Sequence, residues 1–200
     1  MATDRKDNRL IALTGGVGSG KSRILGLLEQ EYGAEVIQTD LVARELEGPG
    51  QPGLLALIRA LGPEIAGEDG ILRKDLLSAM IFGDERIRAK VNGLIHPLVW
   101  EEVRRRAEKP AASVTVVESA VLPENPGDFF DEVWYVYTLK ECRIRRLMES
   151  RGYSEERCLK VMESQASEEE FRRAASRVID NNGSMEEVRR QVEAFFNSRQ

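Results

Sequence analysis

Apolar residues along this chain fall into two patterns that alternate from one end to the other. Short continuous runs rich in branched and aromatic residues predict strands, and they cover residues 9–14, 34–38, 113–118, 132–138 and 176–180. The longer stretches between these runs carry apolar residues at the spacing of a helix. Strands that alternate with helices predict an α/β fold in three layers, with a mostly parallel sheet between helices.

The first and last predicted helices have clear boundaries. The first runs over 22–32 and ends at Gly33. The last runs over 184–196, where Ser184 and Glu187 form a capping box. These signals place one helix directly after the first strand and one after the last.

The regions between strands two and three and between strands four and five are predicted to be nearly all helical. After the second strand, Thr39 is expected to cap a short helix over 41–46. Helical spacing then continues from 51 to 109, which is more helix than a simple crossover needs. Pro97 lacks a backbone N–H, so we expect a new helix to begin there and to cover 98–106. So long a helical insertion suggests a part that covers a substrate.

A phosphate-binding motif follows the first strand. Residues 15–22 read Gly-Gly-Val-Gly-Ser-Gly-Lys-Ser, which is the complete phosphate-loop pattern between a strand and a helix. Lys21 is expected to reach the outer phosphates, and the Ser22 hydroxyl to ligand Mg²⁺. A glycine-rich turn without a ligand is the weaker interpretation, because the motif is complete and in its usual context. The residues expected to hold the nucleotide are Gly16, Val17, Gly18, Ser19, Gly20, Lys21, Ser22 and Arg23.

Composition narrows the class of protein. Hydrophobic residues at 42% and charged residues at 32% are typical of a soluble globular chain, and no apolar stretch approaches the ~20 residues of a transmembrane helix. Residues 1–8 contain no apolar segment, so they predict a short tail rather than a secretory signal. The net charge of −5 argues against broad nucleic-acid binding. Cys142 and Cys158 are too few for a disulfide framework and suggest the reducing cytoplasm.

Asp40 is a candidate catalytic carboxylate. It follows the second strand, and ligands of an open parallel sheet lie beyond the carboxyl ends of its strands. We therefore expect Asp40 and the phosphate loop at the same sheet edge, on adjacent strands. A carboxylate there can accept a proton from a substrate hydroxyl or help to hold Mg²⁺. The alternative, a helix N-terminal cap, is equally compatible with the sequence.

Basic residues and one histidine add further candidates. Arg143, Arg145, Arg146 and Arg151 form a basic run on one predicted helix. One or two of them are expected to stabilise charge in a phosphoryl transfer, while the rest form a solvated face. Arg44 lies one helical turn after Asp40 and either faces the same cleft or carries a surface charge. His96, in Ile-His-Pro, fits a structural role more readily than that of a base.

Several segments together resemble the dephospho-coenzyme A kinase family across nearly the whole chain. The matching segments are residues 13–22, 36–40, 43–44, 69–72, 95–97, 118–122 with Glu124, and 178–181. The phosphate loop alone indicates only a large superfamily of phosphate-loop nucleotide-binding proteins and nucleoside monophosphate kinases. The His-Pro pair in the helical insertion and the late Ile-Asp-Asn segment are more specific.

The resemblance implies a reaction in which ATP, with Mg²⁺, phosphorylates the 3′-hydroxyl of dephospho-coenzyme A. It implies a nucleotide-binding core over 9–40, 110–138 and 176–200, a helical coenzyme-binding region over 41–109, and a lid over 139–175. Asp40 then matches the catalytic carboxylate, and Arg44 and His96 match the coenzyme site. Asn181 matches a loop near the adenine. The family's lid arginine falls near position 150, which leaves Arg146 and Arg151 as candidates.

Two other functions remain open at this stage. One is another small-molecule kinase of the superfamily, acting on a nucleotide or a shikimate-like alcohol. The other is a nucleotide-binding switch without transfer activity, although the base-specific motif that such a protein needs is absent from the sequence. For the kinase we expect no nucleic-acid or membrane partner, and a monomer or a weak homo-oligomer.

Overall fold

The structure is a computed structural model and describes residues 8–198. The tail expected over residues 1–8 lies outside the described residues except for Asn8. Between those limits the chain divides into two compact units. One contains the segments up to Val36 and from Lys109 onward, and the other is the segment Ile37–Glu108. No helix among the described residues is both long enough and apolar enough to span a membrane.

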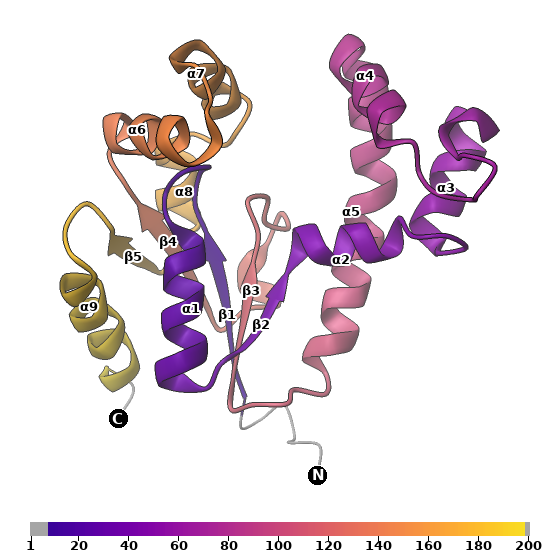
Figure 1. Ribbon diagram of the computed structural model, residues 1–200. Coiled ribbons are helices and arrows are strands. Elements are labelled where there is room, and N and C mark those ends of the chain that lie inside the picture. Colours follow the sequence, from indigo (N-terminus) through magenta and orange to yellow (C-terminus); the bar gives the residue numbers. More distant parts are fainter. Residues whose placement is uncertain (1–7, 199–200) are drawn as a thin grey trace. The chain divides into compact units, whose positions relative to one another are not determined.

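Five strands form one sheet in the order β2-β3-β1-β4-β5 (Figure 1). They are β1 (Arg9–Thr14), β2 (Glu35–Gln38), β3 (Val114–Glu118), β4 (Glu132–Tyr137) and β5 (Arg177–Asp180). β1 pairs in parallel with both β3 and β4, and β4 pairs in parallel with β5. The predicted strands are therefore confirmed to within one residue at either end. β1 lies at the centre of the sheet, which places the loop that follows it at the middle of one sheet edge.

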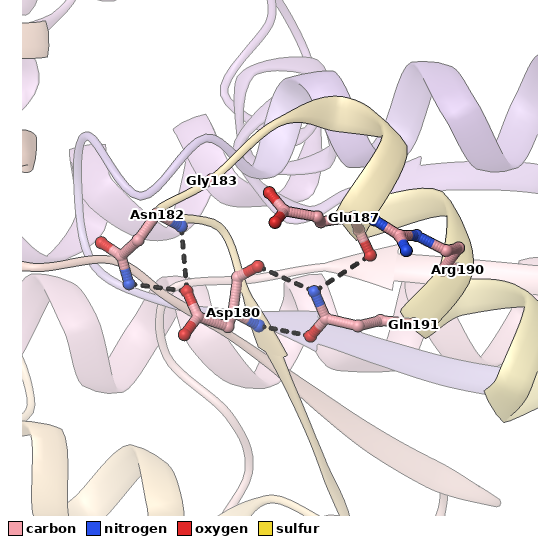
Figure 2. A pocket seen from close by; sticks show the side chains of 6 residues that line it. All are labelled: Asp180, Asn182, Gly183, Glu187, Arg190 and Gln191. Atoms are coloured by element: carbon pink, nitrogen blue, oxygen red, sulfur yellow. Dashed lines mark hydrogen bonds between the residues drawn. The ribbon is translucent and has the colours of Figure 1, made fainter.

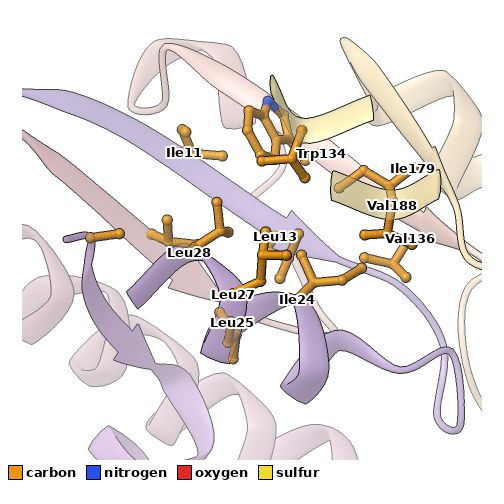
Figure 3. Packing of buried hydrophobic residues seen from close by; sticks show 13 residues of the cluster. Ile11, Leu13, Ile24, Leu25, Leu27, Leu28, Trp134, Val136, Ile179 and Val188 are labelled. Carbon is orange, nitrogen blue, oxygen red and sulfur yellow. The ribbon is translucent and has the colours of Figure 1, made fainter. Parts of the chain in front are cut away.

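Helices cover both faces of this sheet. Along β4, Trp134 and Val136 belong to a buried cluster with α1 (Lys21–Tyr32) and α9 (Met185–Asn197), as Figure 3 shows. Tyr135, one residue between them, stacks instead on Phe171 of α8 (Glu168–Ala174) with ring centroids 5.1 Å apart. Successive residues of a strand point to opposite faces. This alternation confirms the expected three layers.

Local signals fix the ends of these helices as expected. Gly33 ends α1 in the left-handed conformation, at φ 60°, which favours glycine. Ser184 and Glu187 form the predicted capping box of α9. The charged region after β4 contains α6 (Lys140–Arg151), α7 (Glu155–Glu163) and α8. Short connections at 152–154 and 164–167 separate these three helices.

The second unit is almost entirely helical. It contains α2 (Thr39–Leu46), α3 (Pro52–Leu61), α4 (Lys74–Gly83) and α5 (Glu85–Ala107), and the first three all pack against α5. The buried residues of α5 recur every fourth position and form one stripe; they are Val91, Ile95, Val99, Val103 and Ala107. α5 is thus the central support of this unit.

Two predictions about helix boundaries in this unit are wrong. α5 runs through Pro97 without a break. Ile95 and Val99 on either side of it are buried in the same stripe, and Gly93, whose carbonyl loses its partner, is exposed and can be hydrated. Thr39 does not cap the second helix but is its first residue, and Gln38 is the cap without a side-chain hydrogen bond.

Candidate functional site

The phosphate loop joins β1 to α1, and two of its glycines lie directly against side chains of other segments. At Gly16 a Cβ atom would overlap the guanidinium of Arg143, and at Gly20 it would overlap the side-chain amide of Asn181. Gly20 also has φ 93°, a conformation that side chains rarely adopt. The loop backbone therefore lies in direct contact with groups from α6 and from the end of β5. Both contacts depend on the absence of a side chain.

The carbonyl oxygen of Ser19 is the main anchor of the loop. It accepts hydrogen bonds from the Thr138 hydroxyl at 2.9 Å, from Arg146 Nη1 at 3.2 Å and from Asn181 Nδ2 at 2.7 Å. In a trans peptide the carbonyl and the next N–H point in opposite directions. The three donors thus turn the N–H of Gly20 to the other side of the loop. That N–H adds to the amides at the start of α1, the end of a helix at which anions bind.

Arg143 and Gln165 hold the outer part of the loop. Arg143 Nε donates to the carbonyl of Val17 at 2.9 Å. Gln165 Oε1 accepts from the Val17 N–H at 2.9 Å and from Arg143 Nη2 at 3.3 Å. Burial lowers the pKa of the Arg143 guanidinium, while Tyr135 and Glu168 act in the opposite direction. An arginine keeps its charge in proteins, so this corner of the loop is positively charged.

Lys21 lies between the loop and the neighbouring strand. Its Nζ donates to the carbonyl of Gly15 at 2.7 Å and lies 3.5 Å from Glu118 Oε1. Both side chains of this ion pair are mostly buried, at 13% and 14% exposure, so water screens the pair only weakly. Glu118 ends β3, the strand directly beside β1. The pairing of β3 with β1 therefore places the Glu118 carboxylate next to the phosphate loop.

This arrangement corrects one prediction about Asp40. Asp40 and the phosphate loop were expected to follow adjacent strands, but β3 lies between β2 and β1 in the sheet. The sequence argument for Asp40 rested on its place after a strand end, and Glu118 satisfies the same criterion. The sequence shows that Glu118 follows a predicted strand. It does not show the order of strands in the sheet, which places the strand of Glu118 next to β1.

The segment after β5 positions Asn181, which is buried at 2% exposure. Its backbone N–H bonds to the Tyr137 carbonyl, and its own carbonyl accepts from Arg146 Nη2 at 2.9 Å. Beside it lies a hollow of about 490 Å³ lined by Asp180, Asn182 and Gln191. The Asp180 carboxylate accepts from the backbone N–H and the side-chain amide of Asn182, and the Gln191 carboxamide bonds to the backbone N–H and carbonyl of Asp180 (Figure 2). These bonds fix the turn that carries Asn181. Asn181 thereby braces the loop.

The basic run on α6 divides into two groups. Arg143 and Arg146 contact the phosphate loop, as described above. Arg145 is exposed, and its Nη2 lies 3.8 Å from the Cys142 sulfur. Arg151 is exposed at the last residue of α6, with its guanidinium 6.0 Å from the Tyr153 ring centroid. The structure therefore brings Arg146 to the loop and adds Arg143, whereas Arg151 lies at the far end of the same helix.

Ser22 and Arg23 occupy the first turn of α1, and both are exposed. The Ser22 hydroxyl and the Glu118 carboxylate are hard oxygen donors, the type that Mg²⁺ prefers. Among the described residues no group of three or more histidine, cysteine, aspartate or glutamate side chains is arranged to hold a metal ion. The oxygen donors of Ser22 and Glu118 thus suit a cation whose other ligands come from phosphates and water, as is usual for Mg²⁺.

Asp40, Arg44 and His96 all belong to the second unit. Asp40 and Arg44 are exposed one turn apart on α2, so both point to the same side of that helix. Asp40 lies in the first turn and not at the cap. His96 is half-buried on α5, the helix against which α2 packs. Nearby, burial raises the pKa of Glu47, although Lys74 and Arg44 partly offset it.

Comparison with known proteins identifies the family. The family model described as dephospho-CoA kinase matches residues 9–187. The chain belongs to the dephospho-CoA kinase family. A dephospho-CoA kinase from Corynebacterium glutamicum is 42% identical over 183 residues, covering 90% of this chain and 93% of that protein. One from Leifsonia xyli is 38% identical and covers 94% and 97%. The chain spans only 47% of the relative from Mycolicibacterium paratuberculosis, which is 39% identical.

Solved structures agree with this membership. A protein from Thermus thermophilus, TT1252, has a TM-score of 0.80 at 26% identity, covering 96% of this chain and 98% of that one. A dephospho-CoA kinase from Campylobacter jejuni has a TM-score of 0.62 at 20% identity over 96% and 97% of the two chains. At that identity the likeness concerns the fold, and the same fold occurs in a shikimate kinase from Acinetobacter baumannii, with a TM-score of 0.55. The chain is thus a kinase of the phosphate-loop fold.

Proposed function

We propose that this chain transfers the terminal phosphoryl group of ATP to the 3′-hydroxyl of dephospho-coenzyme A. The observation that carries the proposal is a complete phosphate loop, with Lys21 and Glu118 paired beside it, in a chain that matches the family model over residues 9–187. The loop alone supports a nucleotide-binding protein, and the family match supplies the acceptor. A nucleoside or shikimate-like acceptor has no observation in its favour beyond the shared fold.

In this proposal the loop and α6 bind and neutralise the phosphates. The amides at the start of α1 hold the inner phosphates, and Lys21 reaches outward to the phosphoryl group that moves. Arg146 is already fixed near the loop by the Ser19 and Asn181 carbonyls. Phosphoryl transfer has a loose transition state with charge on the outer oxygens. Guanidinium groups at this position therefore stabilise the charge that develops, and we assign this role to Arg146 rather than Arg151.

We further propose that the donor binds as its Mg²⁺ complex. Ser22 and Glu118 would hold the ion, directly or through water, together with phosphate oxygens. When bound, Mg²⁺ neutralises charge on the phosphates. Glu118 would stay paired with Lys21 in this arrangement, and the Gly15 carbonyl would hold the same ammonium group.

Asp40 and the helical second unit are proposed to receive the acceptor. The carboxylate of Asp40 would orient the ribose hydroxyl and take its proton as the new bond to phosphorus forms. Arg44, one turn later on α2, would bind an anionic part of the coenzyme, and His96 would line the same site. Ribose hydroxyls are weak acids, so positioning contributes more than full proton removal.

An acceptor panel tests the proposal. ADP release is measured with Mg²⁺-ATP and, in turn, dephospho-coenzyme A, shikimate and a nucleoside monophosphate. We expect release that depends on dephospho-coenzyme A alone. Release with another acceptor, or equal release with none, would overturn the assignment. In the same assay Asp40→Asn is expected to lower kcat by about 10²-fold or more with little change in ATP affinity, whereas Asp128→Asn, an exposed control, retains activity.

A further inference from the structure

Gln165 occupies an unusual position between two donors at the phosphate loop. It lies in the connection between α7 and α8, 148 residues along the chain from its partner Val17. Its Oε1 accepts from the Val17 N–H at 2.9 Å and from Arg143 Nη2 at 3.3 Å. Both partners are donors, so the side chain must present its oxygen and not its nitrogen to them. The orientation of the carboxamide is thus fixed by the chemistry of its neighbours.

An oxygen held by a loop N–H and a guanidinium is in the environment that phosphoryl oxygens take up. Backbone N–H groups of a phosphate loop cradle phosphates, and arginine binds phosphate oxygens with charge-assisted hydrogen bonds. The amides at the start of α1 bind the inner phosphates, and Lys21 reaches the outer phosphates. Val17, four residues before Lys21, and Arg143 lie at the outer end of the loop. The phosphate that reaches them is the terminal one.

We propose that the carboxamide oxygen of Gln165 and the terminal phosphoryl group of ATP compete for the same two donors, the Val17 N–H and Arg143 Nη2. This inference rests on the proposed binding of ATP at the loop. ATP must displace Gln165, whereas ADP, which lacks the terminal group, leaves the contact in place. Gln165 is then a positioning residue through which the connection between α7 and α8 responds to a triphosphate. It binds no substrate itself.

Two substitutions change the competition in opposite directions. Gln165→Met keeps the size of the side chain but removes the competing acceptor. It should tighten binding of a non-hydrolysable ATP analogue by about threefold or more, because fewer hydrogen bonds are lost on binding. Gln165→Glu supplies a charged acceptor that pairs with Arg143 and repels phosphate. It should weaken binding of the analogue by about tenfold or more. Both changes should leave ADP affinity within about twofold of wild type.

These affinities are measured by isothermal titration calorimetry. Each protein is titrated with the ATP analogue or with ADP, in the presence of Mg²⁺ and without an acceptor. Gln30→Glu, an exposed position on α1, is the control for the change in charge, and thermal unfolding shows that each variant is folded. A weaker analogue affinity in Gln165→Met would overturn the proposal, because it would mean that the side chain helps to bind ATP. Equal changes for the analogue and ADP would also overturn it.

The same measurements separate this inference from the proposed function. Nucleotide affinities are recorded without dephospho-coenzyme A, so they do not depend on which acceptor the enzyme uses. If the wild-type chain failed to phosphorylate dephospho-coenzyme A but the two Gln165 variants shifted ATP affinity in opposite directions, the function would fall and the inference would stand. If instead the wild-type chain phosphorylated dephospho-coenzyme A but the Gln165 variants did not shift ATP affinity in opposite directions, the inference about Gln165 would fall and the function would stand.

Discussion

The side-chain amide of Asn181 donates a hydrogen bond to the carbonyl oxygen of Ser19 at 2.7 Å, across 162 positions of sequence. This bond links the end of the last strand to the loop that follows the first. It is buried, and it shares its acceptor with Thr138 and Arg146. The shape of the phosphate loop is therefore set in part by a residue far away in the chain.

Removing this bond should weaken both the fold and the binding of nucleotide. Asn181→Ala is expected to lower the free energy of unfolding by about 0.5–1.5 kcal/mol, the usual net contribution of a hydrogen bond. ATP affinity should fall by about threefold to tenfold, because the Ser19 peptide is less firmly oriented. Urea unfolding and titration with ATP measure the two effects. Asn197→Ala, at an exposed position, is the control, and a loss of stability with unchanged ATP affinity would contradict the link.

Lys21 and Glu118 should behave as one unit in catalysis. Their ion pair is mostly buried, with the charged atoms 3.5 Å apart. Lys21→Met is expected to reduce kcat/KM by about 10²-fold or more, and Glu118→Gln by about tenfold. Groups in contact are not additive, so the double variant should be close to Lys21→Met alone.

Steady-state kinetics of the four proteins in this double-mutant cycle give the coupling directly. Glu163→Gln, exposed near the end of α7, controls for the loss of one negative charge. If the two single effects simply multiplied in the double variant, Glu118 would have no part in positioning Lys21.

The two candidate lid arginines should differ sharply. Arg146 is held at the phosphate loop, whereas Arg151 lies exposed at the end of α6. Arg146→Ala is expected to lower kcat by about 10²-fold, and Arg151→Ala by less than about tenfold. Turnover with saturating substrates measures both, with the exposed Arg145→Ala as a control on the same helix. A larger loss in Arg151→Ala than in Arg146→Ala would reverse the assignment.

Glu102 on α5 should make stability depend on pH. Hydrogen bonds from Arg105, the larger cause, and from Arg106 lower its pKa to about 2, and burial acts in the opposite direction. An acid with a depressed pKa stabilises the fold above its ordinary pKa of about 4.3, and this contribution is lost as the pH falls towards 2. Glu102→Gln should therefore be less stable than wild type at neutral pH, by no more than about 1 kcal/mol because Arg105 is exposed.

Urea unfolding of wild type and Glu102→Gln at several pH values checks this expectation. The difference in the free energy of unfolding should be constant above about pH 5 and should shrink below it. Glu101→Gln, exposed beside it, is the matched control. A difference that stays constant down to about pH 2.5 would show that the arginines do not stabilise the charged form.

The strands and the phosphate loop could be predicted because their signals are local. A buried strand such as β3 is a continuous run of branched residues, and the loop is defined by consecutive residues. The path of α5 through Pro97 was missed because packing along one whole helix outweighs a single local signal. The position of Glu118 beside Lys21 was missed because the order of strands in a sheet is a property of the whole fold.

The contacts around the loop show the same limit. Gln165 and Asn181 reach the loop from segments 148 and 162 positions away. Nothing in the residues near Gln165 indicates that its carboxamide meets the Val17 N–H. Likewise, the basic run on α6 contains four arginines, and only the turn of the helix decides that Arg143 and Arg146 face the loop. Pairings of this kind are created by folding.

Transfer of label tests the central claim most directly. ATP carrying a labelled terminal phosphate is incubated with Mg²⁺, dephospho-coenzyme A and the enzyme, and the products are separated. The account predicts that the label appears in coenzyme A as an ester at the 3′ position of the ribose, in amounts equal to the ADP formed. Label found only in inorganic phosphate, or at another position of the acceptor, would contradict it.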